Sequence, residues 1–162
     1  MRLGLKSSLV VLLAMMAALP LVAQAQDVVV PYVAPRAANT RVMLPDGSTV
    51  RVELALTDAE QAYGLMGRTN LPEGRGMLFV HEAMEKHPYW MYHCKIGLDI
   101  VWMDGQHRIV EMSPDTPPCR GKSSTCPNYG GHEPSQYVLE LPVGSIQKHR
   151  LAAGETVEFQ VQ

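Results

Sequence analysis

The feature that most constrains the fold is a series of short β-rich runs separated by turn residues. Six such runs follow one another from residue 76 onward: GMLFV (76–80), YWMYH (89–93), LDIVWM (98–103), HRIVEM (107–112), YVLEL (137–141) and TVEFQV (156–161). Runs of this length, rich in β-branched and aromatic residues, are typical of strands. Asp104-Gly105 predicts a tight turn between two of them.

Two further runs surround Pro45-Asp46-Gly47, which predicts a hairpin. In the second of these, apolar residues alternate with Arg51 and Glu53, as expected for a strand with one face in water. Together the runs predict about seven or eight short strands without βαβ alternation. The predicted fold is therefore mostly β, a small single-domain barrel or sandwich.

One helix is predicted directly after the hairpin. Thr57 and Glu60 fit the capping box, in which each side chain bonds to a backbone N–H group near the other residue. We expect this helix to continue to about Met66 and to end at Gly67. The stretch GSIQKH (144–149) is a candidate for one more helical turn.

The first 25 residues predict a secretory signal peptide. Arg2 and Lys6 precede an apolar run from Leu9 to Leu19, and Ala23-Gln24-Ala25 offers a cleavage site. The apolar run is shorter than the roughly 20 residues that a membrane-spanning helix needs. We therefore expect an exported protein, periplasmic or secreted, that is not attached to a membrane after cleavage.

Cleavage after Ala25 would remove 25 of the 162 residues and leave 137, enough for one domain. Residues 26–40 contain two prolines and no periodicity, so we expect an extended lead-in, followed by a single β-rich domain at 41–162. Loss of Arg2 and Lys6 lowers the basic count from 14 to 12 against 16 acids, a net charge of −4. No basic run remains, which argues against a nucleic-acid partner.

Export would place the three cysteines in an oxidising compartment. Cys119 and Cys126 lie in a loop at 113–135 that is rich in Pro, Gly and Ser, whereas Cys94 lies in an apolar run. The simplest arrangement is a Cys119–Cys126 disulfide and one free thiol. A ring this small stabilises by roughly 2.5 kcal/mol, enough to hold a loop in place.

His93 and Cys94 are neighbours in the run at 89–93 and just beyond it. Successive side chains of a strand point to opposite faces, so His93 would not reach the thiol unless the chain bulges there. This argues against a Cys-His nucleophile pair. We expect Cys94 to pack as a small buried side chain and His93 to lie at a strand end.

Asp99 and Glu140 are carboxylates inside apolar runs, where an unpaired buried charge is unfavourable. Asp99 would face water, accept hydrogen bonds from backbone N–H groups, or meet a cation such as Arg68 or His93. A second possibility is that these charges converge in one pocket among aromatic residues, which would suit a small polar ligand. The candidate ligand-binding residues are Arg68, Trp90, His93, Asp99 and Glu140.

Metal sites and known catalytic motifs receive little support from the sequence. HEAME (81–85) begins like the zinc-protease helix motif, but Glu85 occupies the position of the second histidine. Cys119, Cys126 and His132 could bind a metal only if the disulfide did not form. Methionines and histidines at many positions raise the possibility of copper(I) binding, although they lack close clustering: Met43, Met66, Met77, Met84, Met91, Met103, Met112, His81, His87 and His93.

These observations favour a non-enzymatic binding module for a small polar ligand or a protein partner, without a cofactor. One alternative is periplasmic copper binding through Met and His side chains. The other is a hydrolytic enzyme that uses Asp99 or Glu140 as general base. No G-x-S-x-G turn, phosphate-binding loop or Cys-x-x-Cys motif accompanies these residues.

Three stretches, LTDAEQAYGLMGRTNLPEGRGMLF, YWMYHCKIGLDIVWMD and YVLELPVGSIQKHRLAAGETVEF, together with CPNY, resemble domain-of-unknown-function family 192 (DUF192). The resemblance covers about residues 41–161. It implies a small, mostly-β, often exported domain for which no biochemical activity is established. The matching positions include Glu60, Gly64, Leu65, Met66, Arg68, Gly76, Met77, Leu78, Phe79, Trp90, Met91, Leu98, Asp99, Ile100, Val138, Leu139, Glu140, Gly144 and Gly154.

The sequence departs from the family pattern at the His-Cys pair. Family members carry Asn-Thr where this chain has His93-Cys94, and commonly a proline where it has Gly97. The pair is therefore expected to be a local variation. The Cys…Cys-Pro-x-Tyr arrangement of exported relatives implies the same disulfide as the spacing does.

Overall fold

The computed structural model describes residues 27–34, 37 and 39–161. The predicted signal peptide at 1–25 lies outside these residues, and of the expected lead-in at 26–40 only part is described. In the described ranges we find no helix with the length and apolar character needed to cross a membrane.

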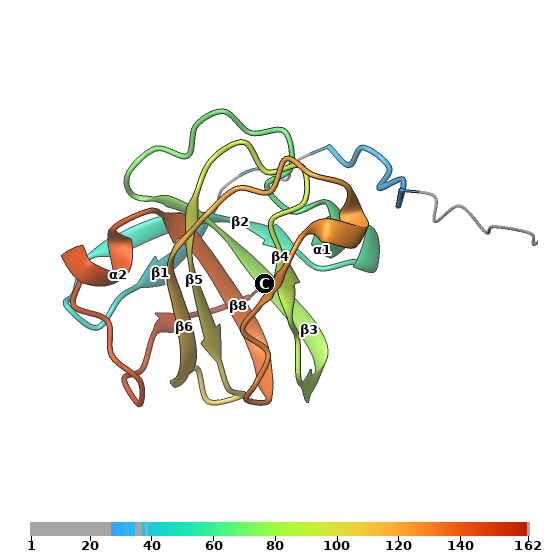
Figure 1. Ribbon diagram of the computed structural model, residues 1–162. Helices are drawn as coiled ribbons and strands as arrows, with labels where there is room; N and C mark the ends of the chain where they lie inside the picture. The colour runs from blue at the N-terminus through green and yellow to red at the C-terminus, as the bar shows by residue number, and fades with distance from the viewer. Residues whose placement is uncertain (1–26, 35–36, 38, 162) are drawn as a thin grey trace, which may run out of the picture.

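Seven strands form one curled sheet with the shape of half a barrel (Figure 1), in the order β6-β5-β8-β3-β2-β1-β9. Their bounds are β1 (Thr40–Met43), β2 (Thr49–Ala55), β3 (Arg75–Glu85), β5 (Leu98–Met103), β6 (Ile109–Thr116), β8 (Ser135–Pro142) and β9 (Glu158–Phe159). A separate two-stranded sheet pairs β4 (Tyr89–Trp90) with β7 (Asn128–Tyr129). The helices are α1 (Asp58–Tyr63), α2 (Ser145–Lys148) and the 3₁₀ helix η1 (Ser123–Thr125). The mostly-β prediction is confirmed.

The two outer strands of the curled sheet approach each other at one end. An isolated antiparallel bridge joins Arg108, just before β6, to Thr156, just before β9. The Ile109 N–H donates to the carbonyl of Glu155, and the N–H of Gly154 donates to the carbonyl of Ile109, both at 2.8 Å. Part of each edge is thereby paired, which protects it from pairing with another chain.

The structure contains one parallel strand pair, which the sequence did not predict. Both β1–β2 and β5–β6 are antiparallel, as expected, but β2 and β3 run parallel, with Arg51 opposite Arg75. Residues 56–74, which include α1, form the crossover between them. A parallel pair needs a crossover connection, and α1, with only six residues, is too short to show a clear helical repeat of apolar residues. The sequence therefore did not indicate a βαβ unit.

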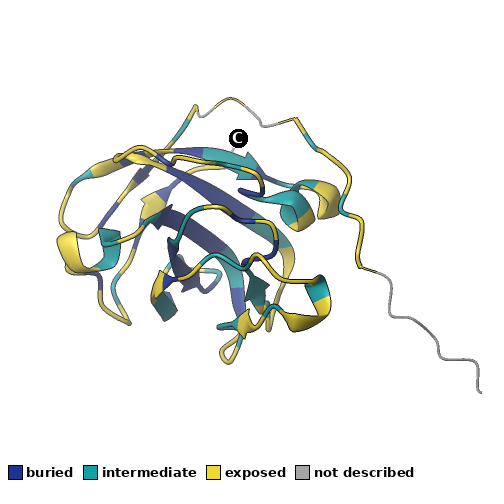
Figure 2. Ribbon diagram, turned by 45° about the horizontal axis from the view of Figure 1, so that its top comes forward, coloured by how far each residue is buried: buried dark blue, intermediate teal, exposed yellow. Residues whose placement is uncertain are grey.

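The central strands of the curled sheet carry most of its buried residues (Figure 2), and their side chains alternate between two apolar cores, one on each face. One core contains Leu78, Val101 and Leu139. The other contains neighbouring residues of the same strands, such as Phe79 and Ile100. All six residues of β5 are buried. A charged residue in β5 or β8 therefore enters one core or the other.

The capping box of α1 is confirmed, but the helix ends earlier than predicted. The Thr57 hydroxyl accepts from the Glu60 N–H, and the Glu60 carboxylate accepts from the Thr57 N–H. Gly64 caps the helix with φ 46°, three residues before the expected end at Gly67. A left-handed conformation is favourable for glycine, and Gly67 also has φ 75°, so two sharp turns follow α1.

The predicted strand at 89–93 extends only over Tyr89–Trp90. His93 has φ 55°, and the N–H of Cys94 donates to the carbonyl of Met91, so the chain turns there. The N–H of Cys119 donates to the same carbonyl at 3.0 Å. The expected face alternation from Trp90 to Cys94 is wrong, because a turn replaces the strand.

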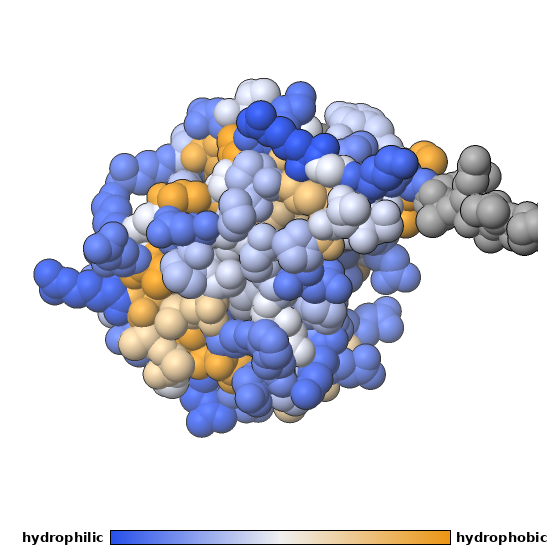
Figure 3. Space-filling view, in the orientation of Figure 1, coloured by the Kyte–Doolittle hydropathy of each residue, from blue (hydrophilic) through white to orange (hydrophobic). Residues whose placement is uncertain are grey.

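The surface is mainly hydrophilic on the side shown in Figure 3, where hydrophobic residues gather mostly toward the left. Several exposed apolar side chains belong to the lead-in, among them Val29 and Tyr32. The other exposed large apolar residues are scattered singly along the chain, which is usual for a globular protein.

Candidate functional site

Asp99 is fully buried and satisfied by the backbone. Its Oδ1 accepts from the Asp115 N–H at 2.8 Å, and its Oδ2 accepts from the Ile146 N–H at 2.7 Å. These bonds tie the end of β6 and the first turn of α2 to β5. Among the three arrangements considered for Asp99, the structure has the one with backbone N–H groups.

Asp99 and Glu140 point to opposite faces of the sheet. In the β5–β8 pairing, Asp99 lies opposite Leu141, whereas Glu140 lies opposite Ile100. Directly opposed residues share a face and successive residues do not. The expected convergence of these two carboxylates in one pocket is therefore wrong.

Arg68 bonds to a carboxylate that the sequence did not single out. Its guanidinium donates two hydrogen bonds to Glu53, at 2.8 and 2.5 Å. This bidentate bond raises the pKa of Arg68. Glu53 lies opposite Met77 in β3, and Met77 lies opposite Glu140 in β8, so Arg68 and Glu140 flank the same face with Met77 between them.

Glu140 and Ser135 are the two buried residues of the described chain with a side-chain polar atom that has no hydrogen-bond partner, and only Glu140 is a carboxylate. Its side chain is enclosed in the second apolar core, and no described residue offers a hydrogen bond to its Oε2. Burial raises the pKa of Glu140 to about 8. Buried polar atoms without a partner are rare in native proteins and call for a physical explanation.

Glu140 lines a small cavity, here called the inner cavity, of about 20 Å³. Tyr89, Trp90, Phe79 and Cys94 also line it. Burial and the charge of Glu140 raise the pKa of Tyr89, whose hydroxyl lies 3.0 Å from Nε2 of His81. The inner cavity thus brings two of the candidate residues, Trp90 and Glu140, together in an aromatic surrounding.

Cys94 is buried and His93 is exposed. Burial, followed by the charge of Glu140, raises the pKa of the Cys94 thiol to about 12. The His93 ring stacks on Tyr92, with ring centres 3.9 Å apart. A thiol with this pKa is a poor nucleophile at neutral pH, and His93 is directed elsewhere. The expectation that Cys94 packs as a small buried side chain is confirmed.

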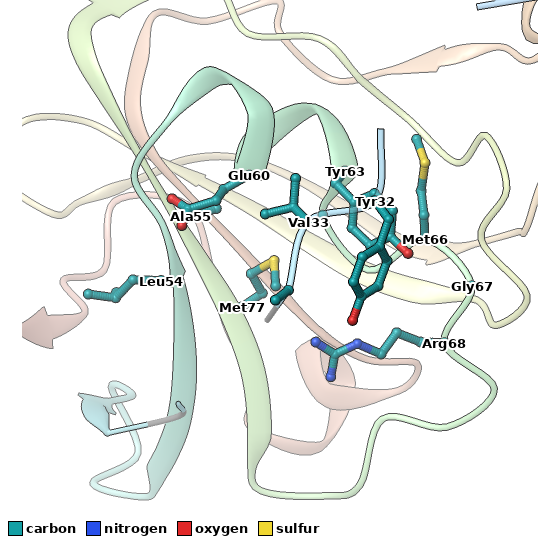
Figure 4. Close-up of a pocket in the computed structure, with 12 residues that line it drawn as sticks. Tyr32, Val33, Leu54, Ala55, Glu60, Tyr63, Met66, Gly67, Arg68 and Met77 are labelled. Carbon is teal, nitrogen blue, oxygen red and sulfur yellow. The ribbon is translucent and has the colours of Figure 1, made fainter. Parts of the chain in front are cut away.

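A larger pocket of about 240 Å³, here called the Arg68 pocket, lies between α1, β2 and the lead-in (Figure 4). Tyr32 and Val33 of the lead-in form one wall, and Met77 lies deeper in the pocket. The ring of Tyr32 packs edge-on against Tyr63, 5.4 Å between centres. The pocket is therefore mostly apolar with one ion pair at its side, which is typical of small-molecule sites.

The Arg68 pocket and the inner cavity share a border made of Tyr63, Gly64 and Met66. A third, shallow depression of about 580 Å³ lies beyond Met66 and is lined by His93, Cys94 and Arg120. The five candidate residues are thus distributed: Arg68 lines the pocket, Trp90 and Glu140 line the inner cavity, His93 lines the depression, and Asp99 lies on the other face.

Sequence reasoning missed Glu53, Tyr32, Tyr63 and Tyr89 as members of this region. Glu53 alternates with valines in its strand, which marked it only as a water-facing residue. Glu53 follows Arg51 by two residues in the sequence, and nothing in this spacing indicated a bond to Arg68. The lead-in carried no periodicity, so nothing in the sequence indicated that Tyr32 would cover a pocket.

The predicted disulfide is present: Cys119 and Cys126 are bonded, and Cys94 is free. Within the described ranges, no three His, Cys, Asp or Glu side chains cluster closely enough to hold a metal ion. Cys119, Cys126 and His132 therefore do not form the alternative metal site.

Comparison with known proteins identifies the family. The model of DUF192, described as an uncharacterised ACR, matches residues 41–159. The chain belongs to DUF192. A comparison with curated proteins finds no match.

Two solved structures are similar to this DUF192 chain. One, from Sinorhizobium meliloti 1021, is described as "a putative transcription regulator"; it is 26% identical, with a TM-score of 0.63, and the match covers 74% of this chain and 91% of that one. The other, from Novosphingobium aromaticivorans DSM 12444, is a protein of unknown function; it is 27% identical, with a TM-score of 0.65, and the match covers 83% and 99%.

The family match assigns the two walls of the Arg68 pocket to different parts of the chain. Arg68, Tyr63 and Met77 lie within the matched residues 41–159. Tyr32 and Val33 precede them. The pocket therefore combines residues of the DUF192 domain with residues of the segment before it.

Proposed function

We propose that this DUF192 protein is exported and is a non-enzymatic binding module for a small organic cation. The observation that carries the proposal is the enclosed Glu140 side chain, which lines a cavity and has an oxygen without a donor among the described residues. A ligand ammonium group would supply both the missing donor and the opposite charge. The aromatic residues around the cavity also suit a cation.

The cavity sizes indicate how such a ligand would lie. The inner cavity, at about 20 Å³, has room for one small group such as an ammonium head. The Arg68 pocket, at about 240 Å³, has room for an apolar body between Tyr32, Met66 and Met77. Met66 borders both spaces, and a change of its flexible side chain would join them.

The binding should depend on pH in a defined direction. Glu140 holds a proton below its pKa of about 8 and must lose it to pair with a cation. Affinity for an amine should therefore increase from pH 6 to pH 8.5. A neutral ligand that accepts a hydrogen bond from protonated Glu140 would show the reverse trend.

The test is a thermal-shift and calorimetric titration of the mature protein with putrescine, phenethylammonium and methylammonium at pH 6 and pH 8.5. We expect at least one amine to stabilise the wild type, and Glu140→Gln to abolish the effect. Glu82→Gln removes an exposed carboxylate of β3 and is the matched control. Binding that persists in Glu140→Gln, or no binding by any of the three amines at either pH, would contradict the proposal.

Export is supported by the Cys119–Cys126 disulfide, because such bonds persist in oxidising compartments. Intact mass of the protein recovered from the periplasm should correspond to a chain beginning at Gln26 with one disulfide. A full-length, reduced chain in the cytoplasm would contradict export.

One observation favours hydrolysis as a second candidate. A carboxyl with a pKa of about 8 is suited to general acid–base chemistry at neutral pH. Its closest thiol, Cys94, is a weak nucleophile, so water would have to attack the substrate directly. Turnover of ester or amide substrates that is lost in Glu140→Gln would favour this candidate, and copper titration with elemental analysis tests the metal-binding alternative.

A further inference from the structure

Three arginines form a row across adjacent strands, on the face of the sheet that also carries Glu53. Arg41 in β1 lies directly opposite Arg51 in β2, and Arg51 lies directly opposite Arg75 in β3. All three residues are exposed. Neighbouring strands are about 4.8 Å apart, so the backbones of the three arginines lie within about 10 Å.

The row is unfavourable for the free protein. Like charges that lie directly opposite each other destabilise a sheet, and Arg51 has such a neighbour on each side. In the part of the chain that the structure describes, no carboxylate forms an ion pair with any of the three guanidinium groups. The whole chain nevertheless carries a net charge of −2.

Two acids near the row are bonded to other cations, whereas Glu158 of β9, which lies opposite Met43 on the face of Arg41, is exposed and forms no ion pair with a described residue. Glu53, which follows Arg51 on the same face of β2, accepts both hydrogen bonds from Arg68. Glu73, in the loop before β3, pairs with Lys148. Among the described residues the row therefore keeps an excess of positive charge, which Glu158 offsets only in part.

The row lines a shallow hollow of about 420 Å³, together with Thr49 and Gly74. Thr49 offers a hydroxyl group beside Arg51. Gly74 has φ 70° and no side chain to obstruct the approach of a ligand. The hollow is formed by strands and not by a long loop, so its arginine backbones are held in fixed register.

We propose that Arg41, Arg51 and Arg75 form a binding site for a soluble anion that carries several phosphoryl groups. The guanidinium fork donates paired hydrogen bonds to phosphoryl oxygens, and three adjacent forks suit a ligand with more than one such group. Binding would also relieve the repulsion within the row. This site is separate from Glu140 and does not depend on the proposed function.

The test is calorimetric titration of the mature protein with sodium tripolyphosphate at 20 mM and 500 mM NaCl. We expect binding at low salt, and affinity that falls at high salt because the charges are exposed. Arg51→Gln, at the centre, should weaken binding at least about tenfold, and Arg41→Gln and Arg75→Gln about threefold each. Lys86→Gln removes one exposed charge just beyond the other end of β3 and should leave binding within about twofold of wild type.

The unliganded variants provide a readout of the row that does not depend on binding. Removing the central charge should raise the melting temperature of Arg51→Gln by about 3 °C at low salt, because two like-charge pairs are lost. This rise would also show that the variant is folded. Equal affinity of Arg51→Gln and wild type for tripolyphosphate, or no binding by wild type at 20 mM NaCl, would overturn the proposal.

Two further arms identify the source of the phosphoryl groups. Inorganic phosphate should bind more weakly than tripolyphosphate. Binding of a 20-base-pair DNA duplex, or of vesicles containing phosphatidylglycerol, in an Arg51-dependent way without tripolyphosphate binding would replace the soluble anion by a macromolecular partner and overturn the proposal.

Discussion

Asp99 and Glu140 are two buried carboxylates on adjacent strands, and they differ in how their oxygens are hydrogen-bonded. Asp99 accepts one backbone N–H on each oxygen and holds two distant segments together. Glu140, one row away on the other face, has an oxygen without a described donor and a pKa of about 8. The comparison shows that burial alone does not assign a role to a charge; the role depends on which donors the fold brings to it.

The largest expected effect concerns the pH dependence of stability at Glu140. Its pKa is about 8 in the folded state and near the ordinary 4.5 when unfolded, so the folded state retains a proton that the unfolded state releases between these values. The free energy of unfolding of the wild type should therefore fall as pH rises from about 4.5 to 8, by about 5 kcal/mol, and level off above pH 8. Glu140→Gln should be free of this loss.

Urea unfolding of wild type and Glu140→Gln at pH 5 and pH 8.5 measures the difference. We expect similar free energies of unfolding at pH 5 and a more stable variant at pH 8.5. A variant that is less stable than wild type at both pH values would mean that Glu140 has a donor in the folded protein.

Removal of the Asp99 charge should destabilise the protein, whereas removal of the Glu140 charge should stabilise it at high pH. Asp99→Asn replaces one accepting oxygen by an NH₂ group that faces an N–H donor, and should lower the free energy of unfolding by about 3 kcal/mol. Hydrogen exchange should increase at the amide, Asp115 or Ile146, that then faces the NH₂ group and loses its acceptor. A loss below about 1 kcal/mol in urea unfolding would mean that the contrast with Glu140 is smaller than the geometry indicates.

Removal of the Cys119–Cys126 disulfide tests whether the loop that carries it affects the surroundings of Glu140. Cys119→Ser with Cys126→Ser should lower the free energy of unfolding by about 2.5 kcal/mol through loss of a short covalent ring. The pKa of Glu140, followed by the unfolding pH profile, should remain near its wild-type value. A profile that changes shape would show that the loop contributes to the enclosure of the inner cavity.

The smallest effect is expected at the Cys94 thiol. With a pKa of about 12 and little exposure, it should react with iodoacetamide at pH 8 at least about tenfold more slowly than a free cysteine. In Glu140→Gln the loss of the nearby charge should lower the thiol pKa slightly and leave the rate low, since burial is the larger cause. Rapid labelling of the folded wild type would contradict the described burial.

The strand series and the capping box were predictable because both rest on local spacing. Thr57 and Glu60 are three residues apart, and the relevant contacts lie within one turn. The disulfide was predictable for a similar reason, since only two cysteines lie in the same loop.

The site was less predictable because it depends on which face each strand presents and on what crosses it. Asp99 and Glu140 have similar apolar neighbours in sequence, and only the β5–β8 register places them on opposite faces. The turn at His93 was missed because YWMYH has strand composition, while a left-handed residue at position 93 redirects the chain. The parallel pairing of β2 and β3, which places Arg51 beside Arg75, likewise depends on a crossover that the pattern did not reveal.

The two-faced burial of β5 and β8 limits how such a sequence can change over evolutionary time. Insertion of a single residue into either strand, unless a bulge absorbed it, would turn the following side chains toward the opposite core. A carboxylate such as Asp99 would then lose its backbone donors and face apolar side chains. Substitutions that preserve size and polarity can accumulate, whereas changes of length are tolerated only in the connecting loops. Strand length, more than residue identity, is the property that homologues must inherit intact.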